Sequence, residues 1–368
     1  MSRINDLIKE MCPNGVEYKL LKDVSEMKRG QSITTKNLKV GKIPVIAGGQ
    51  EPSFYNDKYN REGETITVSS SGAYAGFLNY WNEPILCTDS FSIKAKKLNM
   101  RYLYHYLKMK QNEIYNKKRG AGIPHVHISD LEKFKIPCPP LEVQEEIVRI
   151  LDKFGELEAE LEAELEARKS QYEFWRGKLL NEEYETKHLS ELSTNLDNKR
   201  RPVTKSDRKS GEYPYYGASG IVDYVSGYIF DDELLLVSED GANLMARSTP
   251  IAFSSSGKVW INNHAHVLKF NSMITQKYVE HYLNMIDLSE YITGAAQPKL
   301  NQENLNKIRI NIPSSIEEQE KIVIALKRFD RLINDISVGL PAEIELRKQQ
   351  YKYYRNKLLS FENFHELK

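Results

Sequence analysis

Apolar residues recur at helical spacing over two long segments of the chain. In residues 141–180 they step by three or four positions, which is the period of one face of a helix. With one gap in the spacing, these positions are Ile147, Leu151, Phe154, Leu157, Leu161, Leu165, Tyr172, Trp175 and Leu179. At ~1.5 Å per residue, the segment predicts a rod of roughly 60 Å, longer than an ordinary globular helix. A rod of this length needs a partner helix to cover its apolar face.

The second segment, residues 316–359, repeats the first. Six positions between Gln144 and Phe154 recur 175 places later, and eight positions between Arg168 and Leu180 recur 179 places later. The chain is therefore a duplication with four extra residues inside the second copy. Two matched apolar stripes in one chain predict that the two segments form a coiled coil with each other.

Local signals mark where these helices begin and bend. Ser-x-x-Glu capping boxes begin at Ser129, for a short helix, and at Ser314, for the second rod. Gly339 and Pro341 lie inside the second rod. Because proline inside a helix costs ~3 kcal/mol or more, we expect a kink there.

The blocks outside the rods mix strand-like and helical runs and are distant copies of each other. ETITVSSSGA at Glu64–Ala73 parallels ELLLVSEDGA at Glu233–Ala242, and GAGIPHV parallels GAAQPKL 174 places later. Each block is large enough to fold as a domain. The predicted regions are a first domain at 1–140, a first rod at 141–180, a second domain at 181–312 and a second rod at 313–368.

Charge is distributed unevenly along the chain. Residues 1–140 carry 22 Lys and Arg against 14 Asp and Glu, whereas residues 141–180 carry 6 against 11. A phosphate-binding surface is therefore expected on the domains and not on the acidic first rod. No apolar run approaches the ~18–20 residues of a membrane helix, and the three cysteines lack CxxC spacing. We expect a cytoplasmic protein.

Two divergent blocks alternating with two near-identical rods form a pattern that resembles the specificity subunit of type I restriction–modification systems. The residues that carry the resemblance are IPCPPLEVQEEIVRILDKF at Ile136–Phe154, IPSSIEEQEKIVIALKRF at Ile312–Phe329, ARKSQYEFWRGKLL at Ala167–Leu180 and LRKQQYKYYRNKLL at Leu346–Leu359. The ELEA-ELEA-ELEA run at Glu156–Ala167 is similar to the short tandem repeats of some members. The resemblance covers essentially the whole chain. It implies an α+β fold with two globular α/β target-recognition domains, separated by two long helices in an intramolecular antiparallel coiled coil with pseudo-twofold internal repeat.

The resemblance also implies a function. Such a subunit is a non-catalytic, sequence-specific DNA reader whose two domains each bind one half of a split site, with the rods fixing the spacing. The rods dock two methyltransferase (modification) subunits, and restriction subunits join that core. No cofactor is expected in this chain, and S-adenosylmethionine is expected in the methyltransferase partner.

Enzymatic alternatives lack their motifs. The sequence has neither a cofactor-binding glycine loop with an Asn/Asp-Pro-Pro-aromatic motif nor a Walker loop, so no catalytic residue is expected. A second hypothesis is a coiled-coil adaptor that joins protein partners without touching DNA. An adaptor gives no reason for the globular blocks to diverge while the rods stay matched, and a reader of two different half-sites does.

Candidate DNA-binding residues gather in a basic segment of each block and in loops at glycines. Arg and Lys neutralise phosphates or bind guanine, while Asn and Gln suit adenine. The alternative for each segment is a solvated surface loop. The candidates are Lys28, Arg29, Gln31, Ser32, Thr34, Lys36, Tyr74, Arg119 and His125 in the first block, and Asn198, Lys199, Arg200, Arg201, Lys205, Asn243, Gln297 and Lys299 in the second.

Two His-x-His pairs raise the question of a metal site. His125 and His127, and likewise His264 and His266, would share one face of a strand. No carboxylate or cysteine cluster in the sequence completes either set, and the pairs are not at equivalent repeat positions. We therefore expect no metal.

Overall fold

The computed structural model describes residues 2–33, 39–120, 122–294 and 297–361, and the chain divides into two compact units. Unit 1 comprises residues 1–162 and 343–368, and unit 2 comprises residues 163–342. The division falls inside α6 (Leu141–Leu180), a single helix with the bounds that the apolar period predicted. Within the described parts of the chain, no helix is long and apolar enough to cross a membrane.

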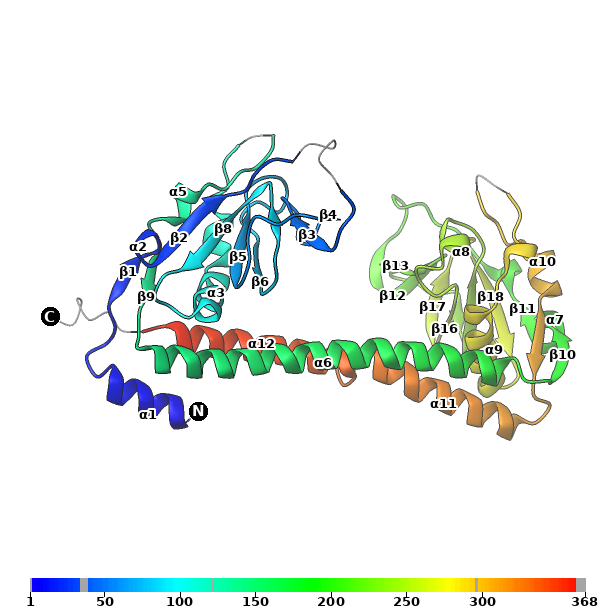
Figure 1. The fold of residues 1–368 in the computed structure, drawn as a ribbon. Helices are drawn as coiled ribbons and strands as arrows, with labels where there is room; N and C mark the ends of the chain where they lie inside the picture. Colours follow the sequence, from blue (N-terminus) through cyan, green and yellow to red (C-terminus); the bar gives the residue numbers. More distant parts are fainter. Residues whose placement is uncertain (1, 34–38, 121, 295–296, 362–368) are drawn as a thin grey trace. The chain divides into compact units, whose positions relative to one another are not determined.

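Unit 1 is built around a four-stranded antiparallel sheet in the order β2-β8-β5-β6, with α3 packed on it (Figure 1). A smaller sheet has the order β4-β3-β7, with β3 parallel to β7, and β1 pairs with β9. The strands are β1 (Tyr18–Leu20), β2 (Ser25–Arg29), β3 (Ile43–Ile46), β4 (Phe54–Asn56), β5 (Thr65–Ser69), β6 (Leu78–Trp81), β7 (Leu86–Cys87), β8 (Ser90–Ala95) and β9 (Lys135–Pro137). The helices are α1 (Ser2–Met11), α2 (Leu21–Val24), α3 (Met100–Met109), α4 (Gln111–Tyr115), α5 (Ile128–Leu131), the first part of α6, and α12 (Leu340–Leu359).

Unit 2 repeats this topology. Its large sheet has the order β11-β18-β15-β16, its small sheet β13-β12-β17-β14 with β12 parallel to β17, and β10 pairs with β19. The strands are β10 (Glu185–His188), β11 (Ser193–Asn195), β12 (Ser210–Gly217), β13 (Gly220–Val225), β14 (Phe230–Asp231), β15 (Leu234–Ser238), β16 (Ala252–Ser255), β17 (Lys258–Ile261), β18 (Ala265–Phe270) and β19 (Arg309–Ile312). The helices are the second part of α6, α7 (Leu189–Leu192), η2 (Asp197–Lys199), α8 (Asn243–Ala246), α9 (Met273–Met285), η3 (Ser289–Tyr291), α10 (Gln302–Lys307) and α11 (Ile316–Asn334).

The central strands of the two large sheets are buried along their whole length. β5 and β15, which contain the matched sequences TITVS and LLLVS, have no exposed residue. Strands covered on both faces carry continuous apolar runs where half-exposed strands alternate. This confirms that the two divergent blocks are copies of one α/β arrangement.

The rods pair in antiparallel orientation, as predicted. In unit 1, the rings of Phe154 in α6 and Tyr354 in α12 stack with centroids 5.3 Å apart. Further along α6, Glu162 accepts a hydrogen bond from Lys348 at 3.0 Å. Because Lys348 precedes Tyr354 while Glu162 follows Phe154, α12 is antiparallel to α6. In unit 2, α11 covers α6 through Tyr172 and Phe329. The apolar stripes are therefore core, and their aromatic residues pack there.

The second rod is two helices. α11 ends at Asn334 and α12 begins at Leu340, so the expected kink is a complete break. The Asp335 carboxylate accepts from the Ser337 amide at 2.8 Å, which satisfies the turn. A Cβ on Gly339 would lie 2.7 Å from three carbonyl oxygens, so only glycine fits. Pro341 falls in the first turn of α12, where a missing amide hydrogen has no helical partner to lose.

A buried glutamine ties each rod to its domain. The Gln144 side chain donates to Pro139 O at 2.7 Å, and the repeat-equivalent Gln319 donates to Pro313 O at 2.7 Å. Each also accepts, Gln144 from the Asn99 amide and Gln319 from the Thr275 hydroxyl. The repetition of this polar pair inside the core explains why glutamine recurs at both positions.

Both predicted capping boxes are displaced. The short helix α5 begins at Ile128, and the Asp130 carboxylate accepts from the His127 amide at 2.9 Å. The second rod is capped by Ser315, whose hydroxyl accepts from the Glu318 amide at 3.3 Å. The boxes proposed at Ser129 and Ser314 were wrong by one or two residues because several Ser, Asp and Glu residues compete near each helix start.

Candidate nucleic-acid interface

Each of the two predicted DNA-binding segments is hydrogen-bonded to an equivalent strand of the small sheet in its unit. After β2, the amide of Gln31 donates to Cys87 O in β7 at 3.0 Å. After η2, the amide of Arg201 donates to Ile261 O in β17 at 3.3 Å. β7 and β17 are the strands paired in parallel with β3 and β12, so the positions correspond. The duplication thus places two different basic segments at equivalent positions of the two units.

The first segment presents its polar side chains to solvent. Lys28 and Arg29 are exposed at the end of β2, and Gln31 and Ser32 follow them, also exposed. Lys28 pairs with Glu26 at 2.9 Å, but both side chains are more than half exposed and such pairs are weak. The lysine thus remains able to meet a phosphate. The predicted contacts Thr34 and Lys36 lie outside the described residues.

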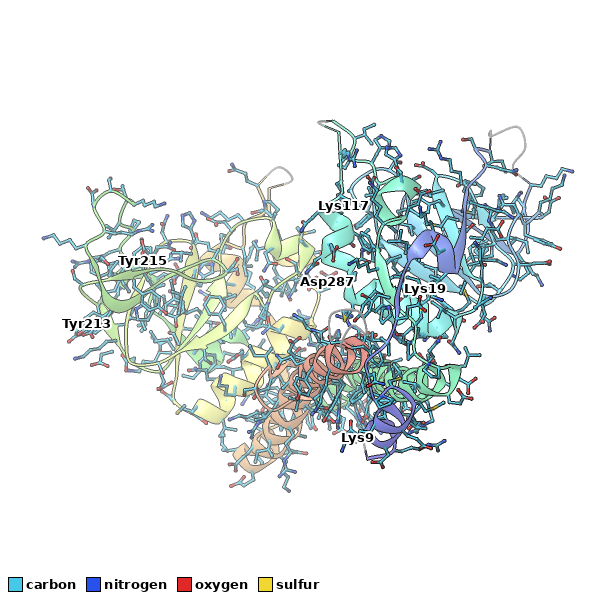
Figure 2. All side chains as sticks on the ribbon, turned by 90° about the vertical axis from the view of Figure 1, so that its left-hand side faces the viewer. Lys9, Lys19, Lys117, Tyr213, Tyr215 and Asp287 are labelled. Carbon is cyan, nitrogen blue, oxygen red and sulfur yellow. The ribbon has the colours of Figure 1, made fainter. Side chains whose placement is uncertain are left out.

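The second segment is held by its backbone while most of its side chains stay exposed. Arg201 O accepts from the Trp260 indole at 2.7 Å. The Val203 amide donates to the hydroxyl of Tyr215, which is labelled in Figure 2, at 3.0 Å. These bonds fix the path of the segment over the small sheet. The exposed predicted residues are Asn198, Lys199, Arg201 and Lys205.

Arg200 differs from its neighbours because its side chain points inward. The guanidinium, only 14% exposed, pairs with Glu239 and lies 3.4 Å from Asp197 Oδ2. It also donates to Ala265 O at 3.0 Å. Its donors are thus engaged within unit 2. Arg200 as a DNA contact remains a prediction that this geometry disfavours, since contact would require breaking the network.

His266 completes this buried network. Its Nδ1 lies 2.6 Å from Asp197 Oδ2 and its Nε2 lies 2.7 Å from Leu300 O, so both ring nitrogens face acceptors. Burial raises the pKa of the Asp197 carboxyl, but the hydrogen bonds from His266 and the Val267 amide, together with the charge of Arg200, outweigh this and the net pKa is lowered. Burial likewise opposes ionisation of Glu239, and the bond from Arg200 lowers its pKa. Both carboxyls are therefore held as carboxylates.

The same residues are the one possible metal-ligand group in the part of the chain that the structure describes. Asp197, Glu239 and His266 offer ligand atoms within 4.8 Å of one another. Arg200 occupies the space between the two carboxylates, and the Lys299 ammonium lies 3.1 Å from Glu239. Two fixed positive charges oppose a metal cation. The donor set fits an ion-pair network and does not fit a metal.

Among the described residues, His125, His127 and His264 join no group of possible metal ligands, and His266 joins only the group with Asp197 and Glu239, which the sequence did not reveal. The rings of His125 and His127 stack at 6.1 Å on the loop of unit 1. In the second pair the two rings have separate partners, since His264 contacts the exposed Asp240 at 2.8 Å while His266 is buried. The absence of a metal at these pairs stays a prediction.

A loop in each unit closes with the same backbone pairing. Arg119 and His125 exchange two amide–carbonyl bonds of 3.0 and 2.7 Å, and Thr293 and Lys299 exchange two of 2.8 and 2.7 Å. In both loops the glycine after the first member has a positive φ, 110° and 85°, which favours glycine. The alignment of GAGIPHV with GAAQPKL is thus a structural equivalence.

Each loop is also tied to the turn that follows its central strand. The Gly72 amide donates to Pro124 O at 3.0 Å, and the Gly241 amide donates to Pro298 O at 3.2 Å. On this common scaffold the side chains differ, with an arginine and a histidine in unit 1 against a threonine and a lysine in unit 2. The two loops therefore share a backbone arrangement and present different side chains.

The remaining predicted residues divide in the same way. Tyr74 is 46% exposed in the turn after β5, and Gln297 is exposed on the loop of unit 2. Asn243 is committed to its own loop, because its amide group accepts from the Thr249 amide at 3.1 Å and donates to Thr249 O at 3.0 Å. It holds the turn after α8, and a DNA contact by Asn243 remains a prediction.

Sequence reasoning missed the carboxylates that position these cations. Asp130 binds Arg119 at 2.5 Å, and Glu239 holds both Lys299 and Arg200. The partners come from different loops, so no spacing rule joins them. A signal that was available is the acidic residue in the turn EDGA after β15, which breaks an otherwise apolar run.

Comparison with known proteins identifies the family. The model of the type I restriction modification DNA specificity domain matches twice, at residues 13–167 and 181–346. The EcoR124I/EcoR124II specificity subunit of Escherichia coli is 32% identical over 362 residues, which cover 83% of this chain and 88% of that protein. A putative type I restriction enzyme specificity subunit of Haemophilus influenzae is 36% identical over 190 residues, which cover 50% of this chain and 48% of that protein.

Solved structures share the fold. The S subunit of a type I restriction–modification system from M. genitalium superposes with a TM-score of 0.63 at 17% identity, covering 94% of this chain and 96% of that one. The repeated family match covers most of each α/β block and the first part of each rod, and it spans most of the chain. The chain therefore belongs to the type I restriction–modification DNA specificity family.

Proposed function

We propose that the chain is the DNA-reading subunit of a type I complex, with unit 1 and unit 2 each recognising one half of a split site. The observation that carries this proposal is the matched loop closure with unmatched side chains, His125 in one unit and Lys299 in the other. A scaffold kept constant while its exposed chemistry changes serves two different half-sites. Family membership supplies the ligand class, double-stranded DNA.

We also propose that the rods dock two copies of one partner, the methyltransferase subunit, through which restriction subunits join. Packing explains why buried side chains recur in both rods, but it does not explain why exposed side chains recur. Phe174 and Tyr353 are repeat-equivalent and 64% and 59% exposed, and Leu141 and Ile316 are equivalent and 50% and 43% exposed. Large apolar side chains kept exposed at both copies support one kind of partner surface, bound once by each unit.

In this proposal the chain performs no chemistry. The methyltransferase subunit would hold S-adenosylmethionine, and this chain would hold no cofactor. Its task is to fix which bases meet the catalytic subunits and how far apart they lie. The continuous helix α6 supports a spacer role, since a 40-residue helix is stiff along its length.

The test uses the full chain assembled with its methyltransferase subunits. Methylated adenines are mapped in genomic DNA treated with the parent complex, and then with complexes carrying His125→Ala or Lys299→Ala. These are matched variants at equivalent positions, so each should relax one half-site and leave the other unchanged. A complex that methylates without any bipartite sequence preference would favour the adaptor hypothesis, in which this chain never reads DNA.

A further inference from the structure

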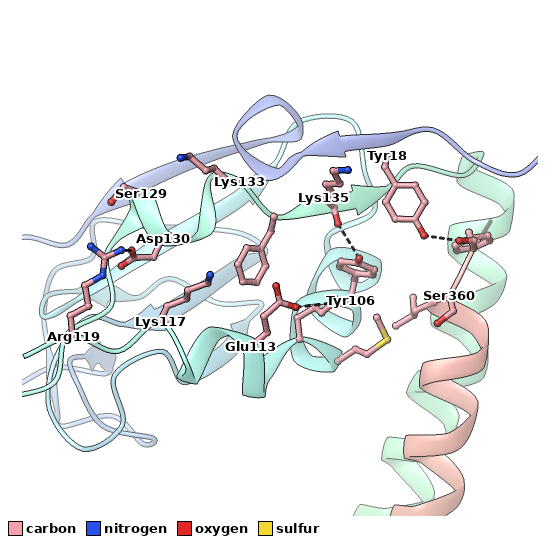
Figure 3. A pocket seen from close by; sticks show the side chains of 15 residues that line it. Tyr18, Tyr106, Glu113, Lys117, Arg119, Ser129, Asp130, Lys133, Lys135 and Ser360 are labelled. Carbon is pink, nitrogen blue, oxygen red and sulfur yellow. Dashed lines mark hydrogen bonds and ion pairs between the residues drawn. The ribbon is translucent and has the colours of Figure 1, made fainter. Parts of the chain in front are cut away.

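A half-open cavity of about 1090 Å³ lies in unit 1 (Figure 3). Its walls come from the β1–β9 pair, from α3 and α4, from the loop that carries Arg119, from α5, and from the C-terminal end of α12. The function proposed above uses only Arg119 among these lining residues. The cavity therefore requires its own explanation.

The lining is strongly basic. It contains five cations and two carboxylates, and each carboxylate already has a partner, Glu113 with Lys110 at 3.2 Å and Asp130 with Arg119 at 2.5 Å. Within residues 2–33, 39–120, 122–294 and 297–361, no carboxylate lies within ion-pairing distance of the other three. These are Lys117 (labelled in Figures 2 and 3), Lys133 and Lys135.

The hydroxyl groups of the two tyrosines in the cavity are already used by the fold. Tyr106 donates to Lys135 O at 2.9 Å, and Tyr18 donates to Phe361 O at 2.8 Å. Burial raises the pKa of Tyr106, so this hydroxyl stays protonated. The tyrosine rings line the inside of the cavity, and the three lysine ammonium groups are available to contact a ligand.

The corresponding region of unit 2 carries less of this charge, although Arg309 keeps a cation at the position of Lys135. Lys133 and Lys307 are repeat equivalents, each two residues before the paired strand, β9 or β19. Lys307 is paired with Glu303 at 2.5 Å, whereas the position of Glu303 in unit 1 is Ser129. Thr293 replaces Arg119 in the second loop. The unpaired positive charge is therefore greater in unit 1, where Lys117 takes the place of Tyr291 and Lys133 has no carboxylate partner among the described residues.

We propose that this cavity binds phosphate groups, supplied either by the DNA backbone that flanks the half-site of unit 1 or by a free polyphosphate. The proposal deepens the DNA-reading function and rests on it for the first source. Three ammonium groups without carboxylate partners suit an anion with several oxygens. Arg119 places the cavity next to the loop predicted to contact bases, because its backbone closes that loop while its side chain lines the cavity wall.

The experiment compares the assembled complex carrying Lys117→Ala and Lys133→Ala with the parent complex. Affinity is measured over a range of salt for duplexes of the methylated site that have long flanks, or a flank shortened on one side or the other. Binding of inorganic tripolyphosphate is measured separately. Lys307→Ala is the matched control, and Lys133→Arg should retain binding because it keeps the charge. All these side chains are exposed, so the variants should fold.

If the backbone fills the cavity, each lost contact should weaken binding about 8-fold at 0.1 M salt and reduce the salt slope by about 0.9. The loss should disappear when the flank on one particular side is removed, and Lys307→Ala should show none of it. If the source is a free polyphosphate, the variants should lose tripolyphosphate binding and keep their DNA affinity.

Parental affinity for both probes would overturn the proposal. So would a loss of assembly with the methyltransferase subunits while tripolyphosphate binding is unchanged, which would assign the cavity to an acidic protein segment. Failure of the parent complex to prefer any DNA site would instead refute the proposed function, and tripolyphosphate binding would still report on the cavity.

Discussion

Replacement of Arg200 should destabilise unit 2, whereas replacement of its neighbour Arg201 should not. Removing one partner of a buried ion pair costs about 3–5 kcal/mol. In Arg200→Ala, Glu239 keeps the Lys299 ammonium at 3.1 Å and Asp197 keeps His266 at 2.6 Å. We therefore expect a cost of about 2–3 kcal/mol, below that range because each carboxylate retains one ion-paired or hydrogen-bonded partner.

The measurement is calorimetric unfolding of the full chain. A domain of this size loses about 2–4 °C per kcal/mol, so the transition of unit 2 should fall by about 4–12 °C in Arg200→Ala. Glu239→Gln in the same chain should restore part of the loss, because it removes the charge that Arg200 neutralises. Arg201→Ala is the matched control and should unfold like the parent.

The two arginines should also separate in DNA binding. Arg201→Ala in the assembled complex should lower the salt slope by about one if the side chain contacts a phosphate. If it reads a base, one position should become degenerate at ~1–3 kcal/mol. The reasoning is refuted if Arg200→Ala unfolds with the parent, or if Arg201→Ala destabilises the chain as much as Arg200→Ala.

Three further outcomes are expected. One ELEA unit added after Ala167 lengthens α6 by ~6 Å and turns one end relative to the other by ~40°. Methylation-site sequencing should therefore show a gap between half-sites that is wider by about one or two base pairs. An active variant with the parental gap would show that α6 is not the spacer. Acidification should destabilise unit 1, because burial lowers the pKa of His105, and because hydrogen bonds, chiefly from His105, overcome the effect of burial and lower the pKa of Asp152 to about 2. Both folded values lie below the unfolded ones, so stability is complete above about pH 6.5 and is lost toward about pH 2; a melting temperature that does not change over this range would contradict the assignment. Gln144→Ala and Gln319→Ala should each lower the free energy of unfolding, measured in urea, by about 1–3 kcal/mol, because each leaves buried polar partners without a hydrogen bond. Losses below about 0.5 kcal/mol would show that these hydrogen bonds are dispensable.

The sequence by itself determined the architecture of this protein. The helical period and the offsets of 175 and 179 residues established the duplication and the bounds of α6, whereas the antiparallel pairing of the rods was implied by the family resemblance. Such features are predictable because they depend on periodicity and on repetition within one chain. Where local signals competed, as at Ser129 and Ser314, the helix starts were misplaced by one or two residues, because several polar residues near each start can serve as the cap.

Only the tertiary structure decided which charged residues face outward. Arg200 and Arg201 are adjacent and chemically identical, yet one is buried against Glu239 and Asp197 and the other is exposed. Asp197 lies three residues before Arg200 in η2, but Glu239 follows β15, and no local pattern brings it to Arg200. The basic cavity of unit 1 has the same origin, since its lysines belong to separate elements that meet only in the fold. The sequence shows which charged residues the chain has, and long-range packing decides where on the surface they lie.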